Sequence, residues 1–575
     1  MKIPLRWTRD FAFPFALAFA FLSGLWLRVY LLADQVFIDD EWHGLYYVIG
    51  KSPAWLLTHF SIPGATCIPL NFYTWVLGAT MGWSELMLRL PSLVCGVLCV
   101  VVGPLLARKF IGTRRAVLLA FLLAICPVLI FYSRICRPYS AVALLAFAAL
   151  LLAARWMRSG GLRPALLFIG AGVLAIYFHL FAVVTVAAPL LAAFVLHAWR
   201  RRPGIPRGAV AGPSLQQWIG VTVVMAGIAA LLTLPALIHS LQSTFFNIAL
   251  KGTFRLDSLP RMAQLISGTG QPVLAALFWA ALIAGAFEQC RRNPWLGWML
   301  VSLYPLHALA LILSRPDAAQ SAILLTRYCI PLVPVSLLFV ACGIQAALEA
   351  ITARATLQPA LQTLTAFAYV IALAITGPLP QCYVAPNNFT SHGNYQHRYG
   401  SIDWQHSFYS DFTPAGFTLI TTVRADEVSP FYQLLADHPD GRPIVEYPMM
   451  IGDHFNPLYY YQHFHRRQVL VGYTTDMSLS RGLAPGNIYG STYIDQVLSL
   501  VHDPSRLRFR NLVSMEDLSA MRGRGVEYVI LHKRFEAQLP EVAPTPPELE
   551  RLWHEYRMTL GAPFYEDAHI AVFRL

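Results

Sequence analysis

Residues 115–157 read RAVLLAFLLAICPVLIFYSRICRPYSAVALLAFAALLLAARWM. Two apolar runs, 115–132 and 138–157, are separated only by the short polar stretch SRICR at 133–137. A helix that spans a bilayer needs about 20 predominantly apolar residues, so each run is close to spanning length. The stretch therefore predicts two consecutive transmembrane helices joined by a tight turn that carries Arg134 and Arg137.

The composition extends this interpretation to the whole chain. The 575 residues are 56% hydrophobic and 13% charged, with a mean hydropathy of +0.51. A globular enzyme carries about twice that charged share. Intrinsic disorder needs low hydrophobicity and high net charge, and nine cysteines are too sparse for a disulfide scaffold. The composition indicates a polytopic membrane protein.

Apolar runs recur through the first 380 residues. They predict about 11 transmembrane helices, with ten as the nearest alternative count. The runs are 11–32, 86–107, 115–132, 138–157, 163–178, 180–198, 216–236, 273–289, 296–313, 328–348 and 361–380. The first run is longer than the apolar core of a signal peptide, so we interpret it as an uncleaved span.

Charge divides the chain at residue 380. Residues 1–380 contain 27 Lys and Arg against 10 Asp and Glu, whereas residues 381–575 contain 16 against 21. The positive excess lies in short loops between apolar runs. This fits the positive-inside rule rather than a nucleic-acid-binding face. We expect the N-terminus inside and everything after residue 380 outside.

After residue 380 the long apolar runs end and short predicted strands alternate with predicted helices. Short strands are expected at 417–423, 443–447, 468–473 and 528–532, and helices at 428–437, 491–502, 515–523 and 547–558. Such alternation predicts a small soluble α/β domain. The predicted organisation is a membrane domain over 1–380, followed by an extracytoplasmic α/β domain over 381–575.

Acidic residues are rare in the membrane part, yet three are consecutive: Asp39, Asp40 and Glu41. They follow the first predicted span on its outer side. Adjacent carboxylates repel one another unless a metal ion, arginines or a shared proton compensates. A solvated start of a loop is the plain alternative, and we favour a functional cluster because acids are otherwise so scarce.

Arg134, Arg137 and Arg327 also fall at outer ends of spans, against the topological bias. A guanidinium fork suits bidentate binding of phosphate, whereas snorkelling to lipid headgroups is the alternative. For Arg134 the two interpretations are evenly balanced. His179 lies at the same boundary, and there too an interfacial role and a functional one are equally supported. Acids facing arginines and a histidine in one interfacial plane would suit a charged, lipid-linked substrate.

These stretches resemble bacterial membrane glycosyltransferases of the GT-C fold, close to the dolichyl-phosphate-mannose protein mannosyltransferase-like family (PMT-like, glycosyltransferase family 39-like or ArnT-like). The resemblance covers roughly residues 10–350. The stretches that carry it are Asp40-Glu41, Pro69–Tyr73 with Gly82–Ser92, Ser133–Tyr139, and Arg327-Tyr328 followed by Pro331 and Pro334. It implies a multi-pass protein of the cytoplasmic (inner) membrane.

The resemblance also implies a reaction in which a sugar passes from a polyprenyl phosphate to an acceptor hydroxyl on the outer face. Asp40 would be the general base, with Asp39 left open as its alternative. The lipid phosphate would be bound by Arg137, Arg134, Tyr139, Arg327, Tyr328 and His179. Glu41 and His43 would position Asp40 or hold a divalent metal ion, Mg or Mn. Where many relatives carry a basic residue before Pro69, this chain has Thr66–Ile68.

The expected partners are a polyprenyl-phosphate-linked sugar donor, a glycan, lipid or protein acceptor, and membrane lipids, with no nucleic acid. Two other functions stay open: a transporter or flippase of lipid-linked envelope precursors, and a non-catalytic membrane scaffold. A transporter more often carries charges at mid-span and broken helices in paired halves. The central expectation is spatial: Asp39–Glu41 and the arginines meet at one pocket beside the membrane surface.

Overall fold

The structure is a computed structural model. It describes residues 5–30, 32, 39–48, 50–60, 67–200, 212–241, 258–314, 322–351, 358–377, 379, 429–439, 441–447, 465–467, 515–533 and 546–575. Internal contacts divide the chain into two compact units. The first unit comprises 1–30, 52–72 and 89–380, and the second comprises 31–51, 73–88 and 381–575. The expected strands at 417–423 and 468–473 and the expected helix at 491–502 lie outside the described residues.

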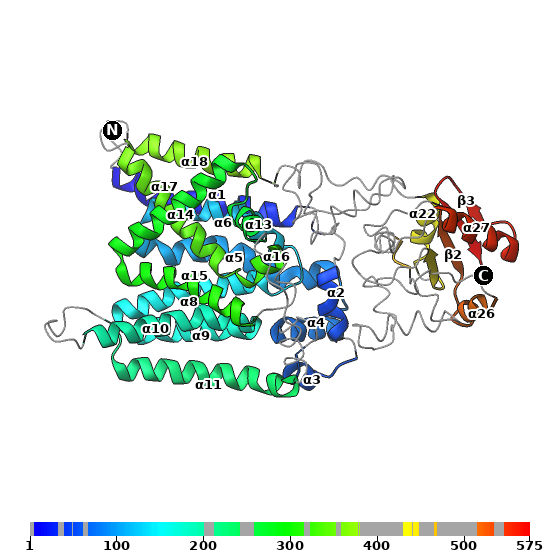
Figure 1. The fold of residues 1–575 in the computed structure, drawn as a ribbon, viewed down its shortest axis with the longest axis horizontal. Coiled ribbons are helices and arrows are strands. Elements are labelled where there is room, and N and C mark those ends of the chain that lie inside the picture. Colours follow the sequence, from blue (N-terminus) through cyan, green and yellow to red (C-terminus); the bar gives the residue numbers. More distant parts are fainter. Residues whose placement is uncertain are drawn as a thin grey trace. The chain divides into compact units, whose positions relative to one another are not determined.

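The first unit is a bundle of long helices that lie side by side (Figure 1). Every predicted span falls on helix. The helices are α1 (Leu5–Val29), α5 (Glu85–Ile111), α6 (Thr113–Ile125), α7 (Pro127–Ser133), α8 (Tyr139–Ser159), α9 (Leu162–Phe178), η1 (Leu180–Ala182), α10 (Val183–Arg200), α11 (Leu215–His239), α14 (Pro272–Arg292), α15 (Pro294–Ser314), α17 (Leu332–Ile351) and α18 (Gln358–Thr376).

The protein is a multi-pass membrane protein. Among the described residues, six helices are long and apolar enough to cross a bilayer, or seven if the bent pair α6–α7 is one span. The four remaining runs lie on shorter apolar helices: Phe13–Val29, Leu162–Phe178, Leu180–Val195 and Leu361–Thr376. The number of spans stays a prediction.

The run predicted as one span at 115–132 is in fact two helices, α6 and α7, bent by 58°. The break falls at Cys126, and Pro127 opens α7. Proline has no backbone N–H, so it cannot bond the carbonyl four residues earlier. The carbonyl of Leu123 therefore needs a donor from elsewhere.

Two glycines let α14 and α17 pack closely against each other. A Cβ built on Gly285 of α14 would overlap the Phe339 carbonyl of α17, and one on Gly343 of α17 would overlap the Ala281 carbonyl of α14. Small residues at matched positions let two membrane helices pack backbone to backbone. This contact fixes α14 against α17.

Charged side chains gather near the C-terminal ends of α14 and α17. Arg115 Nη2 of α6 lies 2.9 Å from Glu288 Oε1 and 3.2 Å from Glu349 Oε2, and Arg292 Nε lies 2.8 Å from the same Glu288 oxygen. Arg115 is buried. Glu288 of α14 and Glu349 of α17 thus neutralise arginines between α6, α14 and α17.

Short helices lie in the connections between the long ones. The stretch between the first two spans contains α2 (Asp39–Val48), α3 (Pro53–Thr58) and α4 (Ile68–Thr80). Two more, α13 (Ser258–Ser267) and α16 (Ala322–Tyr328), were not expected from the sequence. Because α16 ends at Tyr328 and α17 begins at Leu332, Arg327 and Tyr328 lie on a separate short helix rather than at the start of the predicted span 328–348.

The C-terminal region of the second unit is an α/β domain. Its sheet has the order β1-β2-β4-β3, with β1 parallel to β2 and the other pairs antiparallel. The elements are α22 (Pro430–Asp437), β1 (Ile444–Tyr447), α26 (Met515–Gly523), β2 (Tyr528–His532), α27 (Pro546–Leu560), β3 (Tyr565–Glu566) and β4 (Ile570–Arg574). A core that includes Val529, Tyr556 and Phe573 is fully buried. The expected α/β character is confirmed, and β3 and β4 are additions.

Candidate functional site

The candidate site is built around the turn that joins α7 to α8. The turn is tight: the Arg134 amide donates to the Phe131 carbonyl at 2.9 Å, and the Arg137 amide donates to the Ile135 carbonyl at 2.8 Å. Pro138 precedes α8 and fixes the entry of that helix. Both arginine side chains are almost wholly buried. These two hydrogen bonds restrict the backbone of residues 134–137 and so limit where the Arg137 side chain can lie.

Tyr139, the first residue of α8, has two guanidinium groups beside its ring. The Cζ of Arg137 lies 6.0 Å from the ring centroid, and the Cζ of Arg327, from α16, lies 5.8 Å from it. The Tyr328 ring lies 5.8 Å from the same Arg327 carbon. A ring face attracts cations, so Tyr139 helps to hold two like charges in one place.

His179 completes this group from the connection between α9 and η1. Its ring centroid lies 5.8 Å from that of Tyr139 and 6.1 Å from that of Tyr328. Desolvation, together with the charges of Arg327 and Arg137, lowers the pKa of His179 to about 4. The ring is therefore neutral near pH 7. Its Nδ1 accepts from the Phe181 amide at 3.3 Å, so its proton resides on Nε2, which is a donor.

The structure brings together five of the predicted residues: Arg137, Tyr139, His179, Arg327 and Tyr328. Such a group of two fixed cations and a neutral donor can bind an anion with several oxygens, because each partner contributes N–H groups. We call these five residues the Tyr139 cluster.

Arg134 has a different contact from the one expected. Its Nη1 donates to the Arg28 carbonyl at 2.9 Å, close to the end of α1. The last carbonyls of a helix lack partners within the helix, so this bond caps α1. The contact supports a structural role, and a role of Arg134 in phosphate binding stays a prediction.

The acidic residues lie on α2, in the second unit. Glu41 is fully buried. The side chains of Asp39, Asp40 and His43 lie outside the described residues, so their roles and their distance from the Tyr139 cluster stay predictions. No group of three or more His, Cys, Asp or Glu side chains in the described part of the chain is arranged to hold a metal ion. The expected Mg or Mn site at Glu41 and His43 therefore also stays a prediction.

Two residues beside the cluster were missed from the sequence. The Phe181 ring lies 5.6 Å from Tyr328 and 5.9 Å from His307. His307, buried in α15, donates from Nδ1 to the Leu303 carbonyl at 2.9 Å and lies 3.3 Å from Thr185 Oγ1 through Nε2. A histidine inside an apolar run was a signal for His307, whereas nothing distinguished Phe181 from other aromatic residues.

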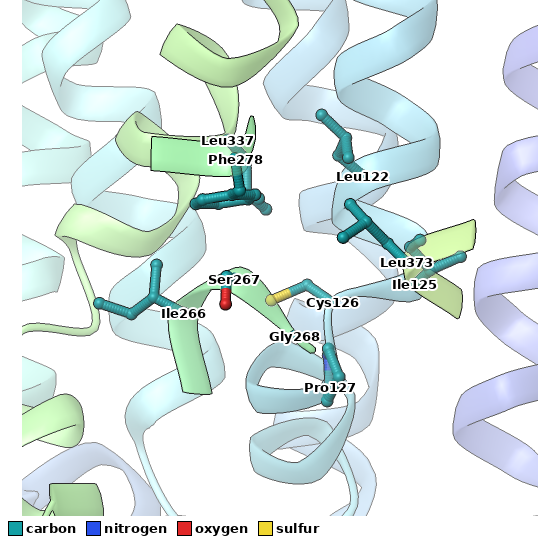
Figure 2. Close-up of a pocket in the computed structure, with 10 residues that line it drawn as sticks. All are labelled: Leu122, Ile125, Cys126, Pro127, Ile266, Ser267, Gly268, Phe278, Leu337 and Leu373. Carbon is teal, nitrogen blue, oxygen red and sulfur yellow. The ribbon is translucent and has the colours of Figure 1, made fainter. Parts of the chain in front are cut away.

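A separate small cavity lies beside the break between α6 and α7 (Figure 2). Its lining consists of Leu122, Ile125, Cys126, Pro127, Ile266, Ser267, Gly268, Phe278, Leu337 and Leu373. The lining has no charged side chain and shares no residue with the Tyr139 cluster, so the cavity is unsuited to a phosphate.

Comparison with solved structures finds the same architecture elsewhere. ArnT from Cupriavidus metallidurans in the apo state matches with a TM-score of 0.51 at 14% identity, over 99% of this chain and 98% of that one. This chain has an ArnT-like GT-C fold. The expected fold class, a polytopic helical membrane protein with a C-terminal domain, is confirmed.

Two further structures are similar at lower scores. ArnT from the same organism bound to undecaprenyl phosphate has a TM-score of 0.49 at 15% identity, over 100% of this chain and 98% of that one. An Archaeoglobus fulgidus oligosaccharyltransferase, crystallised with Zn and sulfate, has a TM-score of 0.41 at 15% identity, over 90% and 67%. No family model and no curated protein matches the sequence.

Proposed function

We propose that the protein is a glycosyltransferase that moves a sugar from a polyprenyl-phosphate donor to an acceptor hydroxyl at the outer face of a bacterial inner membrane. The observation that carries the proposal is the Tyr139 cluster, in which Arg137 and Arg327 converge on one ring beside a neutral His179. Similarity to the ArnT fold supports the same conclusion. A polyprenyl chain lies within the bilayer, so its phosphate belongs at the end of a helix bundle.

The cluster would bind the phosphate of the donor and stabilise it as it leaves. Negative charge grows on the phosphate as its bond to the sugar breaks. Fixed cations in surroundings from which water is excluded stabilise such charge without reorganising. Arg137 is almost wholly buried, which strengthens its electrostatic effect. His179 Nε2–H would add a neutral donor to the same phosphate.

The reaction would be a single displacement. The oxygen of the acceptor hydroxyl forms a bond with the anomeric carbon as the bond from that carbon to the phosphate oxygen breaks. The electron pair of that bond leaves with the lipid phosphate, and the acceptor proton passes to a carboxylate. We assign this base role to Asp40, with Asp39 as the alternative. One displacement inverts the anomeric centre.

Glu41 would support the base. Its buried position suits a side chain that orients a neighbour rather than one that meets solvent. Together with His43 it could instead hold a divalent ion, which would add charge stabilisation. The C-terminal domain lies outside the cytoplasm in this account and faces the acceptor, which is a glycan, a lipid or a protein.

A transfer assay tests the proposal. The full chain is reconstituted in vesicles that contain glycosylated undecaprenyl phosphates of several sugars and a lipid extract as acceptor, and released undecaprenyl phosphate is measured by mass spectrometry. Loss of a general base lowers the rate by about 10²–10⁴-fold, and we expect that loss for Asp40→Asn.

Asp437→Asn, a change on α22 of the C-terminal domain, is the control and should retain the wild-type rate. If Asp40→Asn and Asp39→Asn both transfer at the wild-type rate, the assignment of the base is wrong. If donor binds but no sugar is released or transferred under any condition, the transporter alternative is favoured.

A further inference from the structure

The turn that carries Arg137 rests on a face of α5. Ser92 Oγ donates to the Arg137 carbonyl at 2.7 Å, and Ser92 is buried. One helical turn further on, Gly96 packs against Ser133, so closely that a Cβ at Gly96 would overlap the Ser133 hydroxyl. Residues four apart lie on the same face of a helix. Ser92 and Gly96 thus contact both ends of the turn, at Arg137 and at Ser133, from one face of α5.

Arg28 of α1 holds the same turn from the other side. Its Nε donates to Ser133 Oγ at 3.1 Å. Its Nη2 donates to the Leu123 carbonyl and its Nη1 to the Ala124 carbonyl, each at 3.1 Å. These two carbonyls end α6, and Pro127 cannot serve the first of them. A single fully buried guanidinium therefore connects α1, the break between α6 and α7, and the turn.

We propose that Ser92, Gly96 and Arg28 are positioning residues for Arg137. They hold the backbone of residues 133–137 so that the Arg137 guanidinium faces the phosphate of the donor. This inference rests on the proposed function, because it gives Arg137 the role of phosphate ligand. It adds the reason why Arg137 keeps one orientation in a site that contains a second cation.

Bidentate bonds between guanidinium and phosphate are directional, and a ligand that wanders by about 0.5 Å loses much of its effect. Arg327 beside the same Tyr139 ring repels Arg137. Without the Ser92 bond, the Arg137 carbonyl is free to turn and the side chain can move away from Arg327.

Binding of undecaprenyl phosphate to the purified full chain in detergent tests the inference. Ser92→Ala should raise the dissociation constant about three- to tenfold, because releasing the turn weakens binding by at most the free energy of the one hydrogen bond that orders it. Ser92→Thr retains the hydroxyl and should restore much of the affinity. The matched control is Ser336→Ala: Ser336 is equally buried, but its hydroxyl bonds Tyr304 at 2.8 Å, away from the turn. Its dissociation constant should be that of the wild type.

A second pair of variants tests the packing of α5 against the turn by displacing Ser133. Gly96→Ala pushes against Ser133 and should weaken binding at least as much as Ser92→Ala. Gly103→Ala, on the same helix, meets Phe147 of α8 at 2.9 Å and should leave binding unchanged. If Gly96→Ala does not fold, Ser92→Ala alone decides.

Arg137→Ala separates this inference from the function on which it rests. It should raise the dissociation constant about 10–100-fold, since bonds to a charged group are lost. If Arg137→Ala binds as wild type, the proposed function itself fails. If Arg137→Ala weakens binding but Ser92→Ala and Ser336→Ala bind equally well, the positioning role is wrong and the proposed function stands.

Discussion

Two buried charges, one in each unit, are stabilised in opposite ways. Arg28 in the helix bundle donates to backbone carbonyls and one hydroxyl. Glu446 on β1 accepts from side chains instead: Tyr432 OH and His532 Nε2 lie 2.8 and 3.0 Å from Oε2, and His465 Nε2 lies 3.5 Å from Oε1. All four side chains of this Glu446 cluster are buried.

The difference lies in what can titrate. A guanidinium stays charged at any physiological pH, and the carbonyls around Arg28 do not ionise. The Glu446 cluster contains a carboxylate and two imidazoles. Desolvation alone would raise the pKa of Glu446, but its interactions with His465 and His532 hold that pKa below its ordinary range. Burial lowers the pKa of His465. The contacts of Arg28 should therefore be insensitive to acid where the Glu446 cluster is not.

The largest effect is expected when Arg28 is removed. Arg28→Met leaves the Leu123 and Ala124 carbonyls without their donor in an apolar interior, at about 1–3 kcal/mol for each unsatisfied group. We expect the yield of folded protein, measured by gel filtration in detergent, to fall severely. Arg155→Met, which removes a single bond from Arg155 to the Leu106 carbonyl, should fold nearly as wild type. Equal yields for the two variants would contradict the central role of Arg28.

A smaller effect is expected at the other buried charge. Glu446→Gln keeps the shape but presents an amide to Tyr432, His532 and His465. The C-terminal domain should lose about 2–3 kcal/mol of unfolding free energy, measured by hydrogen exchange of β2 in the full chain. Glu566→Gln weakens two partly exposed ion pairs, with Lys533 and with Arg557, so the loss should stay near or below about 1 kcal/mol. A larger loss in Glu566→Gln would contradict the comparison.

Acid should separate the two buried charges. Both His465 and Glu446 have folded pKa values below their ordinary ones, so the unfolded domain binds protons first and lower pH favours unfolding. The stabilisation is complete above about pH 6.5, the ordinary value for histidine, and is lost as pH falls below it. Protection factors, which correct hydrogen exchange for its intrinsic dependence on pH, should fall in β2 between pH 7.5 and 4.5 but not in α1, which carries Arg28. His465→Gln should flatten the upper part of this response; a wild-type response in that variant would refute it.

The smallest effect is expected at Ser429, which precedes α22. Its Oγ accepts from the Phe431 amide at 3.3 Å and donates to Asp567 Oδ2 at 2.6 Å. Ser429→Ala removes a helix cap that is worth about 1 kcal/mol. Local exchange in α22 should rise while β2 keeps its protection. A loss as large as that of Glu446→Gln would show that buried charge is not what distinguishes the domain.

Much of this fold could be predicted from the sequence because its signals are local. Each predicted apolar run lies on helix, and the strand 528–532 and the helix 515–523 were predicted at their observed bounds. The break at Pro127 was missed because the apolar pattern continues through it. Strand β3 was missed because it has only two residues, Tyr565 and Glu566. Strand β4 was missed because it depends on pairing with β2, a contact between residues far apart in the sequence.

The site was predictable only in part. That Arg137, His179 and Arg327 share one end of the bundle followed from their positions at span ends. The role of Arg28 did not follow, because its partners are backbone carbonyls of α6 that only the bend exposes. The same holds for Ser92, whose acceptor is the Arg137 carbonyl. When a side chain bonds to a backbone carbonyl, any residue type can supply the acceptor, so the sequence contains no partner residue from which the contact could be predicted.

An experimental map of the full chain with bound undecaprenyl phosphate tests the central claim most directly. The account predicts phosphate density within hydrogen-bonding distance of the guanidinium groups of both Arg137 and Arg327, beside the Tyr139 ring. Phosphate density held by other residues, with no contact to either arginine, would contradict it.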